Sequence, residues 1–438
     1  MKALNVGLLG FGTVGKGTWD VLRRNEEEIT RRAGRPIRVT CVSTRTPDRV
    51  RKAVPESAQL AVVDDPHGIT RRDDVAIVCE LMGGIEPART LILDAIRHGK
   101  HVVTANKALL AQYGNEIFAA ASETGVMVAF EAAVAGGIPI IKALREGLTA
   151  NRIEWIAGIV NGTSNFILSE MRSRGASFAE VLKEAQRLGY AEADPTFDVE
   201  GIDAAHKLSI MSAIAFGVPM QFDKAYAEGI SKLAREDIIY AEELGYRIKL
   251  LAITRRAKKG IELRVHPTLI PSKRLIANVE GAMNAVLVMG DAVGPTLYYG
   301  AGAGAEPTAS AVIADLVDVT RMHTADPENR VPHLAFQPDK LSDLPFLPMG
   351  EVETCYYMRM RVDDRPGVLA DITRILADRD ISIDAMIQKE PPEGEKQTDI
   401  ILLTHRSVER QVVDAIARIE DLRTVRGKVV RIRMEPLS

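Results

Sequence analysis

Short apolar runs alternate with longer, partly polar stretches over the first 130 residues. Leu4–Leu9 is a mostly apolar run that ends at Gly10, which predicts a buried strand, and residues 13–32 predict a helix that becomes polar towards its end. Further strands are predicted at 38–44, 75–81, 101–104 and 126–130, with a helix at 87–98. Strands that alternate with helices indicate βαβ units, so we predict an α/β domain with a Rossmann-type, doubly wound parallel sheet.

The alternation weakens after Gly136-Gly137. From about 151 to 300 the pattern shows fewer strands, and its clearest features are helical stretches at 177–188 and 201–216. A further helix is predicted at 307–321, and we expect it to pack back on the first domain. The middle of the chain is therefore predicted to form a second, α+β domain.

The chain beyond residue 322 follows a different order. Residues 323–351 are rich in Pro, Asp and His, which predicts a linker. Beyond it, strands are predicted at 354–362, 381–389, 398–404 and 425–433, with helices at 366–379 and 407–419. This βαββαβ order is the ferredoxin-like motif. The predicted domains are a Rossmann-type domain at 1–135, completed by about 305–325, a middle domain at 136–304, the linker at 323–351, and a C-terminal domain at 352–438.

Composition narrows the class of protein. The chain has 438 residues, a net charge of -3 and three widely spaced cysteines, which excludes a disulfide framework and gives no zinc motif. The charge gives no broad attraction to nucleic acid or to a membrane surface. The sequence shows no signal peptide, and no apolar run approaches the roughly 20 residues that span a bilayer. We therefore predict a soluble, cytoplasmic protein.

The strongest motif follows the first strand. Gly10, Gly12 and Gly15 fit G-x-G-x-x-G, in which the first glycine permits a tight turn, the second lets a pyrophosphate approach the backbone, and the third allows close helix–strand packing. The N–H groups at the start of the next helix then face the phosphates. The alternative is a plain strand–helix turn. The predicted cofactor ligands of this loop are Gly10, Phe11, Gly12, Thr13 and Val14.

The end of the second predicted strand bears on the choice of cofactor. An NAD-preferring site usually places an acidic residue there, whereas this chain has Ser43-Thr44-Arg45. The guanidinium of Arg45 suits a 2′-phosphate, and Lys52 is a possible second cation. The pattern favours NADP over NAD. The alternative interpretation of Arg45 is a solvated surface charge.

Two segments carry candidate chemistry. Lys107 follows a predicted strand at its carboxyl end, where open α/β sheets bind their ligands. Residues 189–207 are dense in carboxylates, and Asp203 and Lys207 are spaced i,i+4, so they share one helix face. On a surface helix such a pair is only a weak ion pair. The surrounding acids and the flanking Pro and Gly make a dedicated pocket the better interpretation.

The segment Gly189–Pro195 (GYAEADP), followed by Asp198, Gly201, Asp203 and Lys207, resembles the homoserine dehydrogenase family. The GFGTVG start, the TANK segment ending at Lys107, FEAAVAGGIPII at 130–141 and GIVNGTSNFIL at 158–168 resemble the same family. The resemblance covers roughly residues 4–320, and it implies that 1–135 is the NAD(P)-binding domain and 136–304 the catalytic and dimerisation domain.

The resemblance implies an NAD(P)-dependent hydride transfer that interconverts L-homoserine and L-aspartate 4-semialdehyde, a step in threonine, methionine and isoleucine biosynthesis. Glu192 would bind the substrate ammonium, and Asp198 and Asp203 would complete the polar pocket. Lys207 is the predicted proton donor in the reduction direction, with Lys107 as a second lysine at the reacting oxygen and beside the cofactor. Which lysine moves the proton stays open.

The resemblance further implies a monovalent-cation site, usually described with sodium and expected to be structural. Glu131 would supply a carboxylate oxygen, and Val134, Gly136 and Ile138 would supply backbone carbonyls, a donor set that suits a hard cation. The alternative is a simple glycine-rich bend. The family also places two further segments near the cofactor or the substrate. These are Thr163-Ser164-Asn165 and the loop that holds Gly302 and Gly304.

The segment Asp364–Leu369 resembles the D-x-P-G-V-L segment of ACT domains, and the βαββαβ order agrees. In that family Gly367 would let the backbone approach an amino-acid ligand, and the pathway implies L-threonine as the effector. The alternative is a dimerisation module without a ligand. We expect a homodimer or homotetramer.

Two other functions compete with this interpretation. An aldehyde-oxidising semialdehyde dehydrogenase needs a nucleophilic cysteine, and Cys41, Cys79 and Cys355 are not placed as nucleophiles. A non-catalytic sensor of NAD(P) and amino acids is the alternative from another class. The acids and lysines between Glu192 and Lys207 argue against it, because a sensor has no need of them.

Overall fold

The computed structural model describes residues 2–389 and 394–437. The chain forms two compact units, each assembled from three segments. The first contains Met1–Gly162, Ile202–Ala225 and Ala282–Leu344, and the second contains Thr163–Gly201, Tyr226–Gly281 and Pro345–Ser438. Among the described residues no helix has the length and apolar character needed to cross a membrane.

A six-stranded sheet is the base of the first unit. Its strands lie in the order β3-β2-β1-β4-β5-β6, and every neighbouring pair is parallel. The order reverses beside β1, as in doubly wound folds. This sheet confirms the predicted Rossmann-type fold. The strands are β1 (Leu4–Leu9), β2 (Ile37–Ser43), β3 (Ala61–Val62), β4 (Ile77–Glu80), β5 (His101–Thr104) and β6 (Val128–Ala129).

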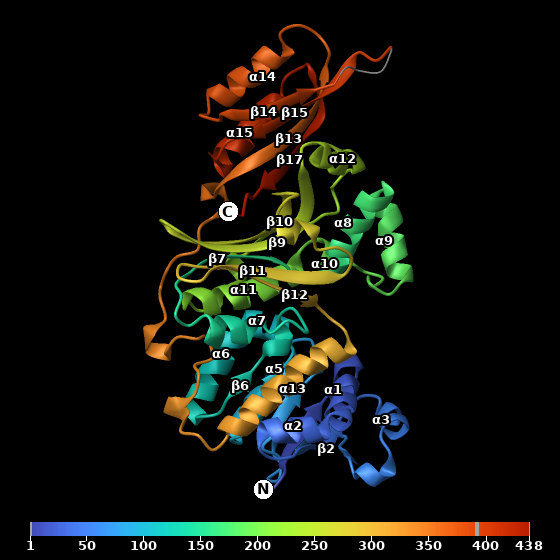
Figure 1. Cartoon of the computed structure of the whole chain (residues 1–438), viewed down its shortest axis with the longest axis vertical. Helices are drawn as coiled ribbons and strands as arrows, with labels where there is room; N and C mark the ends of the chain where they lie inside the picture. The colour runs from blue at the N-terminus through green and yellow to red at the C-terminus, as the bar shows by residue number, and fades with distance from the viewer. Residues whose placement is uncertain (1, 390–393, 438) are drawn as a thin grey trace. The chain divides into compact units, whose positions relative to one another are not determined.

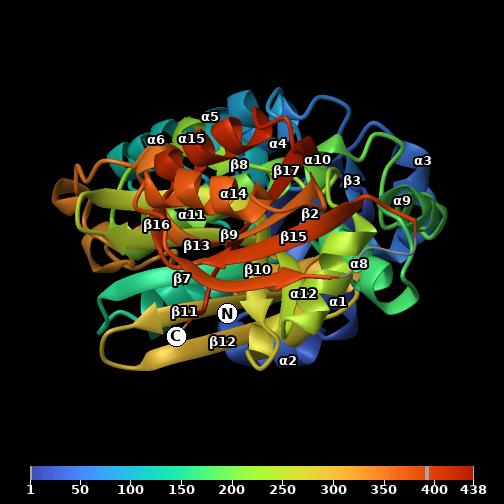
Figure 2. The same cartoon turned by 90° about the horizontal axis from the view of Figure 1, so that it is seen from above.

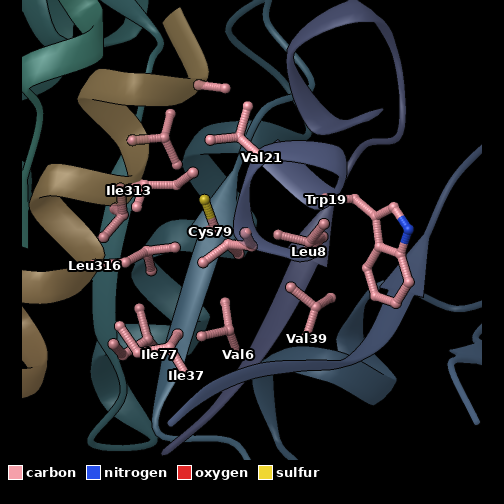
Figure 3. Packing of buried hydrophobic residues seen from close by; sticks show 14 of the residues in the cluster. Val6, Leu8, Trp19, Val21, Ile37, Val39, Ile77, Cys79, Ile313 and Leu316 are labelled. Carbon is pink, nitrogen blue, oxygen red and sulfur yellow. The ribbon is translucent and has the colours of Figure 1, made fainter. Parts of the chain in front are cut away.

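Three helices, α1 (Thr13–Arg24), α2 (Glu26–Ala33) and α13 (Ala305–Met322), lie side by side on one face of this sheet (Figure 1). Figure 3 shows the core beneath them, where Leu8 of β1, Ile77 of β4 and Leu316 of α13 are fully buried. The predicted packing of the late helix on the first domain is therefore confirmed. The predicted helix at 13–32 is wrong in one respect, because the chain leaves the helical conformation at Asn25.

In the sequence, each remaining helix of this domain comes after one strand of the sheet. On the opposite face of the sheet Ile69 of α4 lies against Gly7. The helices are α3 (Pro47–Ala53), α4 (His67–Thr70), α5 (Ala88–Arg97) and α6 (Lys107–Thr124).

The middle of the chain holds more β-structure than the sequence predicted. In the first unit β11 (Met283–Gly290) pairs antiparallel with both β7 (Ile153–Ile159) and β12 (Gly294–Ala301). In the second, β9 (Tyr246–Ala257) and β10 (Gly260–Pro271) form a long antiparallel hairpin. Strands β9 and β10 are buried along most of their length, so they lack the apolar–polar alternation by which strands are recognised.

The helices of the middle region are divided between the two units. The predicted helix at 201–216 is α11 (Ile202–Phe216), in which every residue after the first is buried. The predicted helix at 177–188 is α9 (Phe178–Arg187), which begins with a capping box between Ser177 and Glu180. The other helices are α7 (Ile140–Lys142), α8 (Gly162–Arg174), α10 (Thr196–Val199) and α12 (Arg235–Glu243).

The C-terminal domain has the predicted βαββαβ order. Its sheet runs β17-β13-β15-β14, and Figure 2 shows both helices side by side on one face of it. Near its C-terminal end β17 also pairs in parallel with β10, with Thr268 opposite Arg433, so this domain is joined to the β9–β10 hairpin within the second unit. Its elements are β13 (Glu353–Asp363), α14 (Val368–Ala377), β14 (Ile383–Gln388), β15 (Gln397–Thr404), β16 (Ser407–Val408), α15 (Glu409–Glu420) and β17 (Val425–Met434).

The predicted linker at 323–351 is irregular but is not a free connection. In the first unit the ring of His333 stacks on Phe118 at 5.0 Å, and Ser342 N–H donates to the carbonyl of Gly217. In the second unit Ile261 N–H donates to the carbonyl of Pro345 at 2.8 Å. Packing of this proline-rich segment thus fixes a path that its composition alone does not reveal.

Replacing His101 by asparagine is expected to weaken the pH dependence of stability. His101 is buried at the start of β5, its Nδ1 accepts from Met127 N–H at 3.0 Å, and burial together with nearby Arg330 lowers its pKa to about 4. The unfolded chain binds this proton near its ordinary pKa of about 6.5. The neutral ring therefore contributes its full stabilisation above pH 6.5, and that contribution declines as pH falls from 6.5 to 4.

The asparagine oxygen can still accept from the same N–H group but does not titrate. Urea unfolding at pH 7.5 and pH 4 should show that the wild type loses more stability than His101→Asn, by on the order of 3 kcal/mol. Equal losses in the two proteins would mean that His101 is protonated as easily in the folded state as in the unfolded state.

Candidate functional site

The three glycines after β1 meet three different steric demands. Gly10 has φ +103°, and a Cβ there would lie 2.8 Å from the carbonyl oxygen of Leu81. A Cβ on Gly15 would lie 2.4 Å from the carbonyl oxygen of Gly10, so α1 packs directly on the turn. Around Gly12, by contrast, no atom lies within 4 Å of the Cβ position. The turn is therefore tight at both ends and open in its middle, as a pyrophosphate requires.

Helix α1 begins at Thr13 directly after this open glycine. No side chain caps its N-terminus, and its first turn carries no acidic residue. Phe11 is buried beneath the turn, whereas Thr13 is exposed and Val14 is half-buried. The N–H groups of the first turn thus keep their capacity for an anion.

Arg45 lies where β2 gives way to α3. Thr46 N–H donates to Thr44 Oγ1 at 3.2 Å, which shapes this turn. Arg45 is exposed, and it makes no ion pair with any residue in the described part of the chain. Lys52, on α3, is also exposed.

The segment 104–107 is fixed at the carboxyl ends of β4 and β5. Thr104 Oγ1 donates to the carboxylate of Glu80 at 2.7 Å, and that carboxylate also accepts from the N–H groups of Met82 and Gly83. Asn106 caps α6 through Leu109 N–H and donates to the carbonyl of Gly84 at 2.6 Å.

Fully buried Glu80 was missed by sequence reasoning. It is the last residue of an apolar strand, and the signal that it matters is its position at this sheet edge. Through its hydrogen bonds to Thr104, Met82 and Gly83, Glu80 helps to position Lys107.

A buried carboxylate with two lysines is the centre of the candidate site. The two oxygens of Asp203 meet Lys107 Nζ at 3.1 Å and Lys207 Nζ at 2.6 Å. Asn161 Nδ2 donates to Asp203 at 2.9 Å, and Lys207 Nζ also donates to the carbonyl of Val160 at 2.6 Å. All of these residues belong to the first unit.

The electrostatics of this cluster follow from its geometry. Asp203 and Lys207 are almost fully buried, whereas about a third of the Lys107 side chain is exposed. Burial raises the pKa of Asp203, but the two ammonium groups and Asn161 outweigh burial and hold that pKa far below its ordinary range. The carboxylate is therefore ionised at neutral pH. Asn161, within the segment 158–168 discussed above, was not assigned a role from sequence.

The predicted substrate ligands Glu192 and Asp198 lie in the second unit. Glu192 is exposed, and its carbonyl accepts from Gln186 Nε2 at 3.1 Å. Asp198 is half-buried on α10, and its carbonyl accepts from Ser164 Oγ at 2.9 Å.

Thr163 and Asn165 also hold parts of the second unit together. The hydroxyl of Thr163 donates to the carbonyl of Tyr190 at 2.6 Å. Asn165 Nδ2 donates to the carbonyls of Val279 and Gly281. In the first unit Gly304, with φ +127°, precedes the first residue of α13.

The carboxylate of Glu131 is buried, and backbone N–H groups of the segment that follows bind it. Glu131 accepts from the N–H groups of Ile141 and Lys142 at 2.9 and 2.8 Å, and burial raises its pKa. Its own N–H donates to Asp315, whose pKa burial raises to about 7. Asp315 was missed, because a single acid on an apolar helix gives no signal in sequence.

The glycine-rich chain beyond Glu131 is tightly packed. A Cβ on Gly136 would lie 2.4 Å from the carbonyl oxygen of Gly302, and the carbonyl of Ile138 accepts from Ile140 N–H. Val134 is fully buried. Over residues 2–389 and 394–437, no group of three or more His, Cys, Asp or Glu side chains is arranged to hold a metal ion.

The thiols are unsuited to nucleophilic catalysis. Cys41 and Cys79 are buried in the parallel sheet, and burial raises the pKa of each. Burial likewise raises the pKa of Cys355 on β13. Because the thiolate is the reactive form, these positions argue against thioester chemistry.

The loop before α14 turns at a glycine. Gly367 has φ +91°, is exposed, and has no atom within 4 Å of its Cβ position.

Comparisons with known proteins agree across the whole chain. Residues 10–131 match the family model described as homoserine dehydrogenase, NAD binding domain, residues 139–317 match that of homoserine dehydrogenase, and residues 356–421 match that of the ACT domain. A homoserine dehydrogenase of Pseudomonas aeruginosa is 61% identical over 438 residues, with both chains fully covered.

Solved structures of homoserine dehydrogenases are also similar to this chain. The crystal structure of a homoserine dehydrogenase from Thiobacillus denitrificans is 70% identical, covers 100% of this chain and 99% of its own, and has a TM-score of 0.95. A hyperthermophilic archaeal homoserine dehydrogenase in complex with NADPH is 26% identical, covers 73% of this chain and 98% of its own, and has a TM-score of 0.62.

Proposed function

The chain belongs to the homoserine dehydrogenase family, and from this premise we propose that it interconverts L-homoserine and L-aspartate 4-semialdehyde on the way to threonine, methionine and isoleucine. The observation that carries the proposal is the contact of Asp203 with both Lys107 and Lys207. A buried, ionised carboxylate between two ammonium groups is suited to proton transfer at a reacting oxygen.

We propose a different role for each lysine. In the reduction direction Lys207 Nζ donates a proton to the aldehyde oxygen, and in oxidation it accepts the hydroxyl proton. Lys107 Nζ stabilises the negative charge that develops on the same oxygen. Asp203 orients both ammonium groups, and the carbonyl of Val160 holds Lys207 Nζ from a second direction. When bound, the nicotinamide would supply or take up the hydride. For Glu192 and Asp198 as substrate ligands the proposal rests on the family resemblance.

The reaction is tested by following L-homoserine-dependent reduction of NADP+ and NAD+ by absorbance. We expect turnover with at least one cofactor. Folded protein that reduces neither, in the presence of sodium or potassium, would overturn the proposal and favour a non-catalytic sensor.

We propose NADP as the preferred cofactor, held by Gly10 to Val14, Arg45, Lys107 and Gly304. The guanidinium of Arg45, which follows β2, is exposed and makes no ion pair with the described residues, and this supports the proposal, as does the NADPH complex of the archaeal relative. Arg45→Ala is expected to raise the KM for NADP+ about tenfold, the loss of one charge-assisted contact, and to leave the KM for NAD+ nearly unchanged.

Arg38→Ala is the matched control, because Arg38 is an exposed arginine near the opposite end of the same strand. If Arg45→Ala left both KM values unchanged, as Arg38→Ala should, Arg45 would be a solvated surface charge, and an equal rise in both would place it at a group that the two cofactors share.

We also propose a structural monovalent cation, such as sodium, beside Glu131. The two backbone N–H groups leave other lone pairs of this buried carboxylate available, and a cation would offset the cost of burying its charge. The backbone carbonyls of Val134, Gly136 and Ile138 are the proposed further ligands. For assembly we propose a homodimer or homotetramer.

L-Threonine is the proposed feedback effector, sensed by the C-terminal ACT domain. The open backbone at Gly367 supports an approach by the ligand there. Adding L-threonine to the turnover assay tests this regulation, and turnover unchanged by it would favour the dimerisation module.

A further inference from the structure

Glu80 is a buried acid at the carboxyl end of β4 that no cation of the protein offsets. Its side chain is fully buried, and it makes no ion pair with any residue that the structure describes. Its oxygens accept from the N–H groups of Met82 and Gly83 at 2.8 and 3.1 Å and from Thr104 Oγ1 at 2.7 Å. Because a buried charge is costly without a partner of opposite sign, this position suits a cationic ligand group.

The hydrogen bonds around Glu80 are those of a carboxylate. Asn106 N–H donates to Thr104 Oγ1 at 3.1 Å, so the hydroxyl hydrogen of Thr104 is left for Glu80. The other two partners are backbone N–H groups, which can only donate. All three partners are therefore donors, and the carboxylate is the form of the side chain that only accepts.

The topology places Glu80 on the nicotinamide side of the crevice. The strand order reverses beside β1, and dinucleotides bind across that point, with the pyrophosphate at the turn after β1 and the adenosine near the end of β2. The nicotinamide half therefore extends towards the ends of β4 and β5, which are Glu80 and Thr104. The residue after Glu80 also packs on the glycine turn, because a Cβ on Gly10 would lie 2.8 Å from the carbonyl oxygen of Leu81.

Charge at these strand ends matters because the nicotinamide ring is a cation in NADP+ and neutral in NADPH. Lys107 and Lys207 bring two positive charges to the site against the single negative charge of Asp203, so this cluster alone would repel the oxidised ring. Glu80 adds a second negative charge at the same end of the sheet. The two ammonium groups and the two carboxylates then sum to zero.

We propose that the charge of Glu80 makes the site favour the oxidised form of the nicotinamide cofactor, a role beyond holding Lys107 in place. The inference rests on the proposed function, because it concerns the cofactor of that reaction. Tighter binding of NADP+ relative to NADPH makes bound NADPH the stronger hydride donor, since the two affinities and the redox equilibrium on the protein are linked. Glu80 thus favours reduction of the aldehyde.

The test compares Glu80→Gln with the wild type by fluorescence titration with NADPH and by displacement of bound NADPH with NADP+. Glutamine keeps an oxygen that can accept from Met82 and Gly83 and removes the charge. We expect the Kd for NADP+ to rise about tenfold and the Kd for NADPH to change less than about twofold. Urea unfolding checks that the variant is folded. Both Kd values are measured without turnover, so a protein that shows this shift but does not oxidise L-homoserine would overturn the proposed reaction and leave the role of Glu80 standing.

Thr104→Val and Glu80→Asp are the controls, because they keep the charge and disturb the hydrogen bonds. In each, the two Kd values should change by the same factor, so that their ratio stays within about twofold of the wild-type ratio. The proposal is overturned if folded Glu80→Gln keeps the wild-type ratio, or if either control shifts the ratio as far as the tenfold change expected for Glu80→Gln. The second criterion applies even where Glu80→Gln is unstable.

Discussion

Replacing Lys207 by alanine is expected to lower kcat for L-homoserine oxidation about a thousandfold, within the range that a positioned acid–base group contributes. The reason is geometric. Lys207 Nζ is held by Asp203 at 2.6 Å and by the carbonyl of Val160 at 2.6 Å, so no other group is fixed in the same place. Stopped-flow and steady-state kinetics with NADP+ measure kcat, and fluorescence titration with NADPH should show cofactor binding retained.

The obvious objection is that Lys207→Ala damages the fold. Removing one partner of a buried ion pair costs roughly 3–5 kcal/mol when it leaves a charge uncompensated. Here Asp203 keeps Lys107 at 3.1 Å and Asn161 at 2.9 Å, so we expect a smaller loss. Thermal unfolding of the variant checks this directly.

Lys207→Arg separates charge pairing from proton transfer. A guanidinium preserves the positive charge beside Asp203, but it does not release a proton at accessible pH. We therefore expect Lys207→Arg to be folded and still slower than the wild type by at least a hundredfold. Wild-type kcat in this variant would assign the proton transfer to Lys107, and Lys107→Ala should then show the larger loss of kcat.

The sequence predicted the parts of the fold in which local pattern and tertiary environment agree. Buried parallel strands read as short apolar runs, so Leu4–Leu9 and His101–Thr104 were predicted with the bounds that the structure gives. The long hairpin of β9 and β10 was missed for the opposite reason. Its residues are buried on both faces and include charged side chains such as Arg264, which pairs with Glu435 from a distant part of the chain. No local pattern contains that partner.

In the candidate site, too, the sequence predicted the contacts that a local pattern contains and missed the others. The i,i+4 spacing of Asp203 and Lys207 predicted their contact, because both lie on one helix. Lys107 is 96 positions away from Asp203 in the sequence, and only the family resemblance brought them together before the structure did. Glu80 and Asn161 were missed because a single acid or amide at the end of a strand has no distinguishing pattern. Their roles depend on which strands become neighbours.

Gly12→Val is expected to weaken cofactor binding about a hundredfold, or by about 2.7 kcal/mol, while leaving the stability of the apoprotein nearly unchanged. No atom lies within 4 Å of the Cβ position of Gly12, and its φ of -77° is open to any residue. The added Cβ therefore stands in open space, and the side chain occupies the space that we expect the pyrophosphate to require. Fluorescence titration with NADPH and urea unfolding without cofactor measure the two quantities.

Gly15→Ala is the matched comparison, because it adds a carbon to the same motif where the protein itself fills the space. Its Cβ would lie 2.4 Å from the carbonyl oxygen of Gly10, so α1 must shift away from the turn, and overpacking of this kind costs roughly 1–3 kcal/mol. Gly15→Ala should thus lose stability in the absence of cofactor, whereas Gly12→Val should not. If both variants lost stability equally and Gly12→Val bound NADPH as the wild type does, the open space at Gly12 would have no part in cofactor binding. If Gly12→Val lost cofactor binding and Gly15→Ala lost stability, then within one motif of six residues the ligand would require Gly12 and the fold would require Gly15.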